Sequence, residues 1–382
     1  MLFLPPDTEY IIETLQKNGH ESYAVGGCVR DMLNGDTPHD FDITTSAEPE
    51  TVMSLFEKTV PTGIKHGTVT VIINGIPNEV TTYRTDGEYR DHRRPDSVIF
   101  VKSLREDLAR RDFTVNAMAY NKKDGLIDCF GGKDDVKNRI LRAVGEPERR
   151  FYEDALRILR LFRFSSVLGF DIEENTLKAA LEFVGTLKNV SAERIYAELL
   201  KALCGKNPKA LKPLTDMGGL SFLGIKNSPD YDKIPLLKLP ELKLFAFLYS
   251  GGTDVLATLE HLKAPNKTKN AARDMLRLLN LPLPKTKPDI KEMLYLTSPS
   301  SVENYFNYKD ACKESTESAR ILLDEIAENK EPYKISDLEI TGKDLIKLGI
   351  TGEAVGETLE RLRRLVISDP ALNKKEKLIR NT

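Results

Sequence analysis

The sequence predicts an α+β protein in which a small mixed sheet with flanking helices is followed by a long all-helical part. Two observations support this class. Helix and strand signals alternate from residue 1 to about residue 145. From residue 147 onward strand signals almost vanish, and helical patterns separated by turn signals continue to residue 382. A chain of 382 residues is long enough for two or three domains with sizeable cores.

Each element of the N-terminal part has its own signal. A helical spacing begins at Asp7, which we expect to cap the helix, and a tight turn at Asn74–Gly75 is expected to join two strands with period-two alternation. The predicted elements are a helix over 7–18 that ends before Gly19, a strand over 21–25, a turn and helix over 26–35, and strands over 39–45, 68–73 and 78–84.

Composition and charge describe an ordinary globular protein. Hydrophobic residues make up 40% of the chain and charged residues 30%, which excludes a disordered or fibrous class. Lys and Arg number 56 against 58 Asp and Glu, and this balance neither demands nor excludes a nucleic-acid partner. The four cysteines are far apart and form no CxxC pair, which is typical of reduced thiols. With no signal peptide and no run long enough to span a membrane, we expect a cytoplasmic protein without a membrane partner.

The stretch "PHDFDITT" places Asp40 and Asp42 two positions apart, so on a strand their carboxylates would share one face. Two such charges repel unless a proton or a cation lies between them. Carboxylates at this spacing suit Mg²⁺, which commonly uses one or two of them together with substrate phosphates. Glu79, on the next predicted strand pair, is a candidate third carboxylate. The alternative is a strand whose hydrated acids face solvent.

The stretch "YAVGGCVRD" runs from a strand through Gly26–Gly27 into a helix. Backbone N–H groups and a helix N-terminus would meet there, and Arg30 on the first turn would add a positive fork, as in a phosphate site. Taken alone, two glycines can equally serve a tight strand-to-helix turn. A phosphate cradle close to a pair of Mg²⁺-binding carboxylates favours phosphoryl or nucleotidyl transfer.

These residues resemble a known family. The stretch "AVGGCVRDMLNGDTPHDFDITT", residues 24–45, is similar to the signature of the class II tRNA nucleotidyltransferases, the CCA-adding enzymes, and of their relatives the bacterial poly(A) polymerases. Further blocks follow in the order of that family, namely "RRDFTVNAMAY" at 110–120, "DCFGGKDDV" at 128–136, "EDALRILRLFRF" at 153–164 and "SAERIYAEL" at 191–199. The resemblance implies a nucleotidyltransferase head over 1–147, a neck over 148–208, a body over 209–300 and a tRNA-binding tail over 301–382.

The resemblance also implies roles for individual residues. It assigns Asp40 and Asp42 to Mg²⁺, with Glu79 as a further catalytic carboxylate. It assigns a set of nucleotide-binding residues, of which Gly27 and Arg30 would hold the triphosphate and Asp112 would face the ribose. The whole set is Gly26, Gly27, Arg30, Arg111, Asp112, Asp154, Arg157, Arg160 and Arg163.

The block at 153–164 can also be interpreted from its residues. Apolar positions follow helical spacing, while Asp154, Arg157, Arg160 and Arg163 recur every third residue. Such a stripe is usually a solvated face. In this stripe every cation is Arg and none is Lys, and Arg is the residue suited to planar, two-pronged recognition.

Cytosine and adenine each present an amino donor beside a ring-nitrogen acceptor. Asp154 as acceptor and Arg157 as donor would fit both. Uracil and guanine would face unpaired buried charges, a mismatch that can discriminate by about four orders of magnitude.

The expected reaction is attack of a tRNA 3′-hydroxyl on the α-phosphate of CTP or ATP, with Mg²⁺ as cofactor. The charged segment over 84–100 resembles the flexible loop of full CCA-adding enzymes and argues against an enzyme that adds only CC. An enzyme that adds only A and a poly(A) polymerase stay open as alternatives. A catalytically silent RNA-binding protein is disfavoured by the intact acids at 40 and 42.

Overall fold

The computed structural model describes residues 2–86 and 98–382, and the chain divides into two compact units, Met1–Pro229 and Asp230–Thr382. The strands lie in the first unit, and the second unit is built from helices. The predicted α+β class, with a mixed sheet near the N-terminus and helices after it, is confirmed. The finer division at residues 147, 208 and 300 stays a prediction.

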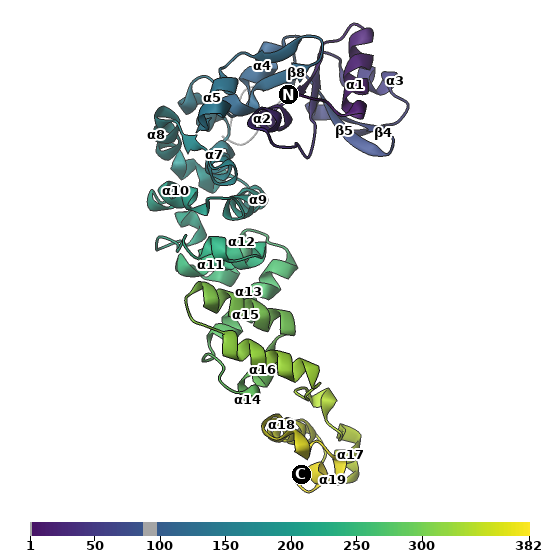
Figure 1. Cartoon of the computed structure of the whole chain (residues 1–382), viewed down its shortest axis with the longest axis vertical. Helices are drawn as coiled ribbons and strands as arrows, with labels where there is room; N and C mark the ends of the chain where they lie inside the picture. Colours follow the sequence, from purple (N-terminus) through teal and green to yellow (C-terminus); the bar gives the residue numbers. More distant parts are fainter. Residues whose placement is uncertain (1, 87–97) are drawn as a thin grey trace. The chain divides into compact units, whose positions relative to one another are not determined.

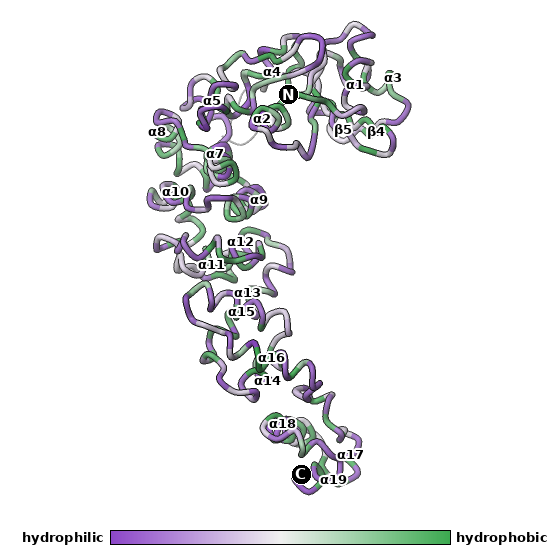
Figure 2. The backbone as a smooth tube through the Cα atoms, in the orientation of Figure 1, coloured by the Kyte–Doolittle hydropathy of each residue, from purple (hydrophilic) through white to green (hydrophobic). Residues whose placement is uncertain are grey.

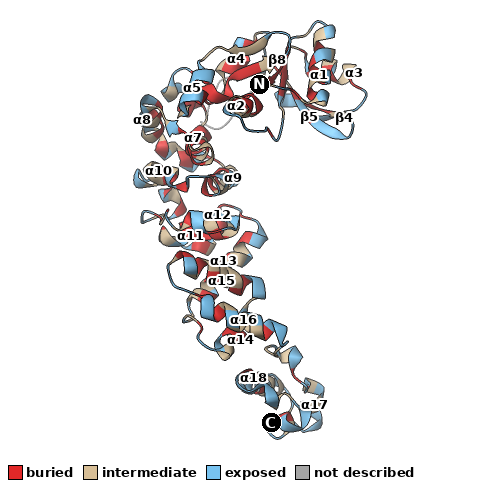
Figure 3. Ribbon diagram, in the orientation of Figure 1, coloured by how far each residue is buried: buried red, intermediate tan, exposed pale blue. Residues whose placement is uncertain are grey.

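The first unit is organised around a seven-stranded sheet with the order β3-β4-β5-β2-β1-β8-β9 (Figure 1). Its strands are β1 (Ser22–Val25), β2 (Ile43–Thr45), β3 (Thr59–Gly63), β4 (Thr68–Ile73), β5 (Ile76–Thr82), β8 (Met118–Asn121) and β9 (Gly125–Asp128). The β2–β5 pair is parallel and the other neighbouring pairs are antiparallel. Every residue of β1 and β2 is buried, so the middle of the sheet lies in the core (Figure 3).

The turn between β4 and β5 has the predicted chemistry. Asn74 and Gly75 have φ angles of 51° and 82°. Two successive residues with positive φ are typical of the tight turn that matches the twist of an antiparallel hairpin. This turn fixes the register of β5, which carries Glu79.

Two short strand pairs lie outside the large sheet: β6 (Arg84–Asp86) with β7 (Val98–Phe100), and β10 (Ile140–Leu141) with β11 (Asp171–Ile172). The charged segment predicted over 84–100 therefore begins and ends in a two-stranded ribbon. Its residues 87–97 lie outside the described residues.

The helices of the first unit are α1 (Pro6–Lys17), α2 (Gly27–Asn34), α3 (Pro49–Leu55), α4 (Leu104–Ala109), α5 (Gly132–Asn138), α6 (Pro147–Glu153), α7 (Leu156–Leu168), α8 (Glu174–Glu182), α9 (Ala192–Leu203) and α10 (Lys212–Asp216). Helix α1 begins one residue before the predicted cap Asp7, because Pro6 has the fixed φ that suits a first helical position.

Two predicted elements begin three or four residues later than expected, and both differences concern acidic residues. The strand predicted over 39–45 covers only Ile43–Thr45, so Asp40 and Asp42 precede it. The helix predicted over 153–164 begins at Leu156. Aspartate is disfavoured in strands and helix interiors, because its carboxylate competes for nearby backbone N–H groups.

The second unit consists of α11 (Pro240–Ser250), α12 (Val255–His261), α13 (Asn266–Leu279), α14 (Lys287–Leu296), α15 (Pro299–Ala311), α16 (Glu317–Glu328), α17 (Gly342–Lys347), α18 (Glu353–Ser368) and α19 (Lys375–Ile379). Helix α13 packs against α11, α12 and α15, and α14 packs against α16 and α18. Hydrophobic and hydrophilic segments alternate along these helices, as expected for amphipathic packing (Figure 2). No helix in the described ranges is long and apolar enough to cross a membrane.

Candidate active site

A cavity of about 570 Å³ in the first unit collects most of the predicted site residues. It is formed by the β1–α2 turn, the beginning of β2, strands β4 and β5, the segment after α4, and helices α7 and α9. The predicted residues that line it are Gly26, Gly27, Arg30, Asp42, Glu79, Arg111, Asp112, Asp154, Arg157 and Arg160. Asp40 and Arg163 are not among the lining residues.

The sheet brings two acidic residues, Asp42 and Glu79, to the same cavity. Asp42 directly precedes β2, and its carbonyl oxygen accepts a hydrogen bond from the Val25 N–H at 2.9 Å. The parallel register pairs Ile43 with Val80, so one residue earlier Asp42 lies beside Glu79. Both residues line the cavity.

Electrostatics support a cation at Asp42. Burial raises the pKa of the Asp42 carboxyl; Arg111 opposes this rise and the neighbouring Asp40 adds to it. The side chain is exposed toward the cavity, but enough protein surrounds the carboxyl group to disfavour its charge. A carboxylate in this situation is stabilised by a hard cation.

A divalent cation therefore fits the donor set, but it would need further oxygens. Within the described ranges no three His, Cys, Asp or Glu side chains converge into a ready-made metal site. Mg²⁺ usually completes its coordination with water and substrate phosphates, so two carboxylates suffice for it. Glu79 as a further catalytic carboxylate stays a prediction.

The phosphate side of the cavity combines a glycine turn with arginines. Gly26 has a φ of +81°, and a Cβ there would lie 3.0 Å from Arg111 Nη1, so glycine lets that guanidinium approach the turn. Arg30 Nη1 donates to Asn116 Oδ1 at 2.5 Å, and its guanidinium lies over the Phe164 ring.

A buried carboxylate orients two of the arginines. Asp107 is fully buried and accepts from Arg110 Nε at 2.9 Å and from Arg111 Nη2 at 3.2 Å. Burial works against the charge of Asp107, but Arg111 and Arg110 outweigh it and hold the pKa of this carboxyl below its usual value. Asp107 thus keeps both guanidinium groups at the cavity wall.

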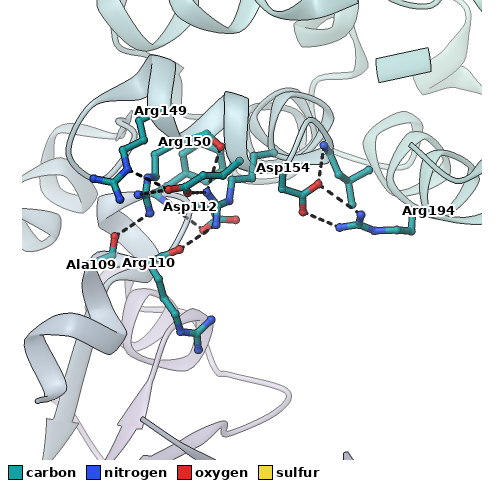
Figure 4. A network of polar contacts seen from close by, with 11 residues as sticks. Ala109, Arg110, Asp112, Arg149, Arg150, Asp154 and Arg194 are labelled. Carbon is teal, nitrogen blue, oxygen red and sulfur yellow. Dashed lines mark hydrogen bonds and ion pairs between the residues drawn. The ribbon is translucent and has the colours of Figure 1, made fainter. Parts of the chain in front are cut away.

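The opposite wall carries Asp154, which Figure 4 shows beside Arg194. Arg157 also lines the cavity. Asp154 follows α6 with an extended backbone conformation, and its Oδ1 accepts a hydrogen bond from the Leu156 N–H at 3.0 Å. Arg157 Nη1 donates to Glu153 Oε2 at 2.6 Å, and its Nη2 donates to the Arg110 carbonyl at 3.0 Å.

The stripe on α7 is not a solvated face. Only 9% of the Arg157 side chain is exposed, and 17% of Asp154. The opposite side of α7 is buried as predicted, at Ala155, Ile158, Leu159 and Phe162. Arg157 is therefore largely buried, whereas Arg160, one turn further along the same side, is 33% exposed.

A chain of ion pairs continues along α7. Arg160 Nη2 lies 2.6 Å from Asp112 Oδ2, and Arg163 Nε lies 2.6 Å from Glu198 Oε2. The Arg163 guanidinium also covers the Phe164 ring at 3.7 Å from its centroid. Arg163 does not line the cavity but packs against Phe164, which does, and its predicted contact with the nucleotide stays a prediction.

Three arginines that the sequence did not single out also line the cavity, namely Arg84, Arg110 and Arg194. Arg110 precedes Arg111 in the block at 110–120, but its orientation depends on Asp107. Arg194 lies in the block at 191–199 and pairs with Asp154, 40 residues earlier. A signal did exist for Arg194, because a cation in the first turn of a helix is unusual.

Comparison with known families defines the class. The family description "Poly A polymerase head domain" matches residues 22–142, "Probable RNA and SrmB- binding site of polymerase A" matches 169–223, and "tRNA nucleotidyltransferase domain 2 putative" matches 241–381. The first match contains the glycine turn, both aspartates and Arg111. Fold and cavity thus define a nucleotidyltransferase with a poly(A) polymerase type of head.

Whole-chain relatives narrow the class. The CCA-adding enzyme of Staphylococcus saprophyticus is 35% identical over 96% of this chain and 95% of its own length, and that of Oceanobacillus iheyensis is 39% identical over 96% and 94%. The crystal structure of the Bacillus stearothermophilus CCA-adding enzyme in complex with CTP covers 98% of this chain and 96% of that one, with 34% identity and a TM-score of 0.82. The chain belongs to the CCA-adding enzyme family, and the resemblance noted in its sequence is confirmed.

Proposed function

We propose that this protein adds C, C and A to the 3′ end of tRNA, using CTP and ATP and no nucleic-acid template. One observation carries the proposal. A single cavity holds the Gly26–Gly27 turn and Asp42 at one wall and Asp154 with Arg157 at another. Groups suited to a triphosphate and a cation thus share a cavity with a donor–acceptor pair suited to a base edge.

The base would be selected by hydrogen-bond complementarity. Asp154, an acceptor when ionised, would take the amino group of cytosine or adenine, and Arg157 would donate to the adjacent ring nitrogen. Arg157 is held by Glu153 and by two backbone carbonyls, so its guanidinium is fixed before any nucleotide arrives. Uracil and guanine would leave buried charges unpaired, which is costly.

The phosphates would be held by the opposite wall. Backbone N–H groups at the start of α2, together with Arg30 and Arg111, would neutralise the triphosphate. Asp40 and Asp42 would hold Mg²⁺, with Glu79 as a further carboxylate in the same cavity as Asp42. When bound, the metal would supply a lower pKa for the attacking hydroxyl and charge stabilisation for the phosphates. The new bond joins the tRNA 3′-oxygen to the α-phosphorus, and the bond to the bridging oxygen of pyrophosphate breaks.

Similarity over the whole length favours complete CCA addition. The relatives named above are CCA-adding enzymes that match both units of this chain, so an enzyme that adds only A and a poly(A) polymerase are not favoured. The helical second unit, with its match to a tRNA nucleotidyltransferase domain, would bind the tRNA. An enzyme of this activity would act in the cytoplasm.

The test is an incorporation assay with three radiolabelled tRNA substrates, ending before CCA, after CC and after CCA. With Mg²⁺, CTP and ATP, we expect three nucleotides on the first, one A on the second and none on the third. Extension of the second substrate alone would identify an enzyme that adds only A. Long A tails on unrelated RNA would identify a poly(A) polymerase.

A further inference from the structure

Arg194 forms a two-pronged ion pair with Asp154 at the wall that we propose to read the base (Figure 4). Arg194 Nη2 lies 2.7 Å from Asp154 Oδ2, and Nη1 lies 3.4 Å from Oδ1. The two side chains are 27% and 17% exposed, and both line the cavity. Partial burial and two-pronged geometry distinguish this pair from surface ion pairs, which are worth little.

The position of Arg194 in its helix is unfavourable for local structure. It is the third residue of α9, in the first turn, where the helix dipole favours acids and disfavours cations. A Glu or Gln at this position could complete a capping box with Ser191, yet the Ser191 side chain makes no cap hydrogen bond. Residues that are unfavourable for local helix stability are expected mainly at functional sites, so the position of Arg194 indicates a functional role.

The ion pair with Arg194 determines how many acceptor positions of the Asp154 carboxylate are occupied. An ionised carboxylate has about four acceptor positions, two on each oxygen. Oδ1 accepts from the Leu156 N–H and from Arg194 Nη1, which accounts for both of its positions. Oδ2 accepts from Arg194 Nη2, so within the described part of the chain one position on Oδ2 is left for an incoming donor.

We propose that Arg194 is a positioning residue for nucleotide selection, because it fixes the Asp154 carboxylate with one acceptor position left for the amino group of cytosine or adenine. This inference rests on the proposed function. A fixed acceptor faces the carbonyl oxygen of uracil or guanine unfavourably. A carboxylate released from Arg194 can rotate away from that oxygen, so the penalty against the wrong base would shrink.

The test compares kcat/KM for CTP with kcat/KM for UTP on a tRNA ending before CCA. In Arg194→Gln we expect the CTP-to-UTP ratio to fall about tenfold or more, the scale of one misplaced polar contact. Arg194→Lys, which keeps the charge but not the fork, should give an intermediate ratio. Lys201→Gln removes one charge from an exposed position of the same helix and should leave the ratio unchanged.

A double-mutant cycle separates positioning from general structural damage. When Asp154 is already replaced in Asp154→Asn, adding Arg194→Gln should change the ratio little, because the carboxylate that Arg194 holds is gone. A parent-like ratio in a folded Arg194→Gln would overturn the inference and leave the proposed function standing. If Arg194→Gln does not fold, a parent-like ratio in Arg194→Lys overturns it. Failure of the parent protein to add CMP would instead refute the proposed function.

Discussion

Asp112 and Arg160 form an ion pair that joins the segment after α4 to helix α7, with 2.6 Å between Asp112 Oδ2 and Arg160 Nη2. Burial of Asp112 opposes its charge, but Arg160 outweighs burial, and the Arg160 and Asn116 hydrogen bonds help to hold the pKa of this carboxyl at about 2. The pair fixes one wall of the cavity against the other.

This ion pair predicts a specific acid sensitivity. The folded pKa of Asp112 lies below its unfolded value, so the pair stabilises the fold above about pH 4 and loses its effect as the pH falls toward 2. Asp112→Asn should lower the free energy of unfolding by roughly 2 kcal/mol at pH 6, and the difference from the parent should shrink below pH 4. Urea unfolding at a series of pH values measures this. A difference that stays constant down to pH 2.5 would contradict it.

Asp42→Asn should abolish nucleotide incorporation and yet raise the thermal midpoint in metal-free buffer near pH 7. The folded protein disfavours the Asp42 charge, since the folded pKa is raised above the unfolded one, so the ionised form destabilises the fold at neutral pH. Differential scanning fluorimetry with and without MgCl₂ measures the midpoint. Mg²⁺ should raise the midpoint of the parent more than that of the variant.

Asp36→Asn is the matched control for this prediction. It removes a carboxylate from an exposed position near Asp42 in sequence that does not line the cavity. Incorporation and the response to Mg²⁺ should both be parent-like. An Asp42→Asn protein that still adds CMP at the parental rate would refute the assignment of this carboxylate to the metal.

Arg157→Lys should weaken selection against UTP and GTP while much of the fold is kept. Lysine can still pair with Glu153, but it cannot hold the Arg110 and Arg150 carbonyls and present a flat donor edge at once. We expect the CTP-to-UTP ratio of kcat/KM to fall about tenfold or more. Steady-state incorporation kinetics measure it, and an unchanged ratio would remove Arg157 from base selection.

Gly132→Ala should destabilise the first unit strongly. A Cβ at Gly132 would meet the Thr114 carbonyl oxygen at a distance far below contact, and that carbonyl is backbone and cannot turn away. We expect a loss of about 2 kcal/mol or more in the free energy of unfolding. Gly185→Ala, which meets open space with an ordinary φ, is the control and should lie within about 0.5 kcal/mol of the parent.

The sequence predicted the elements that depend on local chemistry. Asn74–Gly75 formed the expected turn, and the apolar positions of α7 formed the expected buried side. It also predicted about half of the residues that line the cavity, because Gly26, Asp42 and Asp154 belong to short sequence blocks whose residue types and spacing indicate phosphate, cation or base binding. In each case the residues that make up one signal lie within a few positions of one another in the sequence.

What the sequence could not predict depends on contacts between distant segments. Arg194 pairs with Asp154, 40 positions away, and the orientation of the Arg110 side chain depends on its hydrogen bond to the buried Asp107. The helix break at Asp154 was missed because the apolar spacing continues through it, while its carboxylate captures the Leu156 N–H. Arg163 shares the stripe of Arg157 in sequence, but Glu198 and the Phe164 ring hold it outside the lining.

Base selection by Asp154 and Arg157 is tested most directly by a crystal structure of the protein with Mg²⁺ and a non-reactive CTP analogue. We expect the cytosine amino nitrogen within hydrogen-bond distance of the Asp154 carboxylate, its ring N3 within reach of the Arg157 guanidinium, and the triphosphate at the Gly26–Gly27 turn. A cytosine that contacts neither side chain, with the triphosphate bound elsewhere, would contradict the proposed roles of Asp154, Arg157 and the glycine turn.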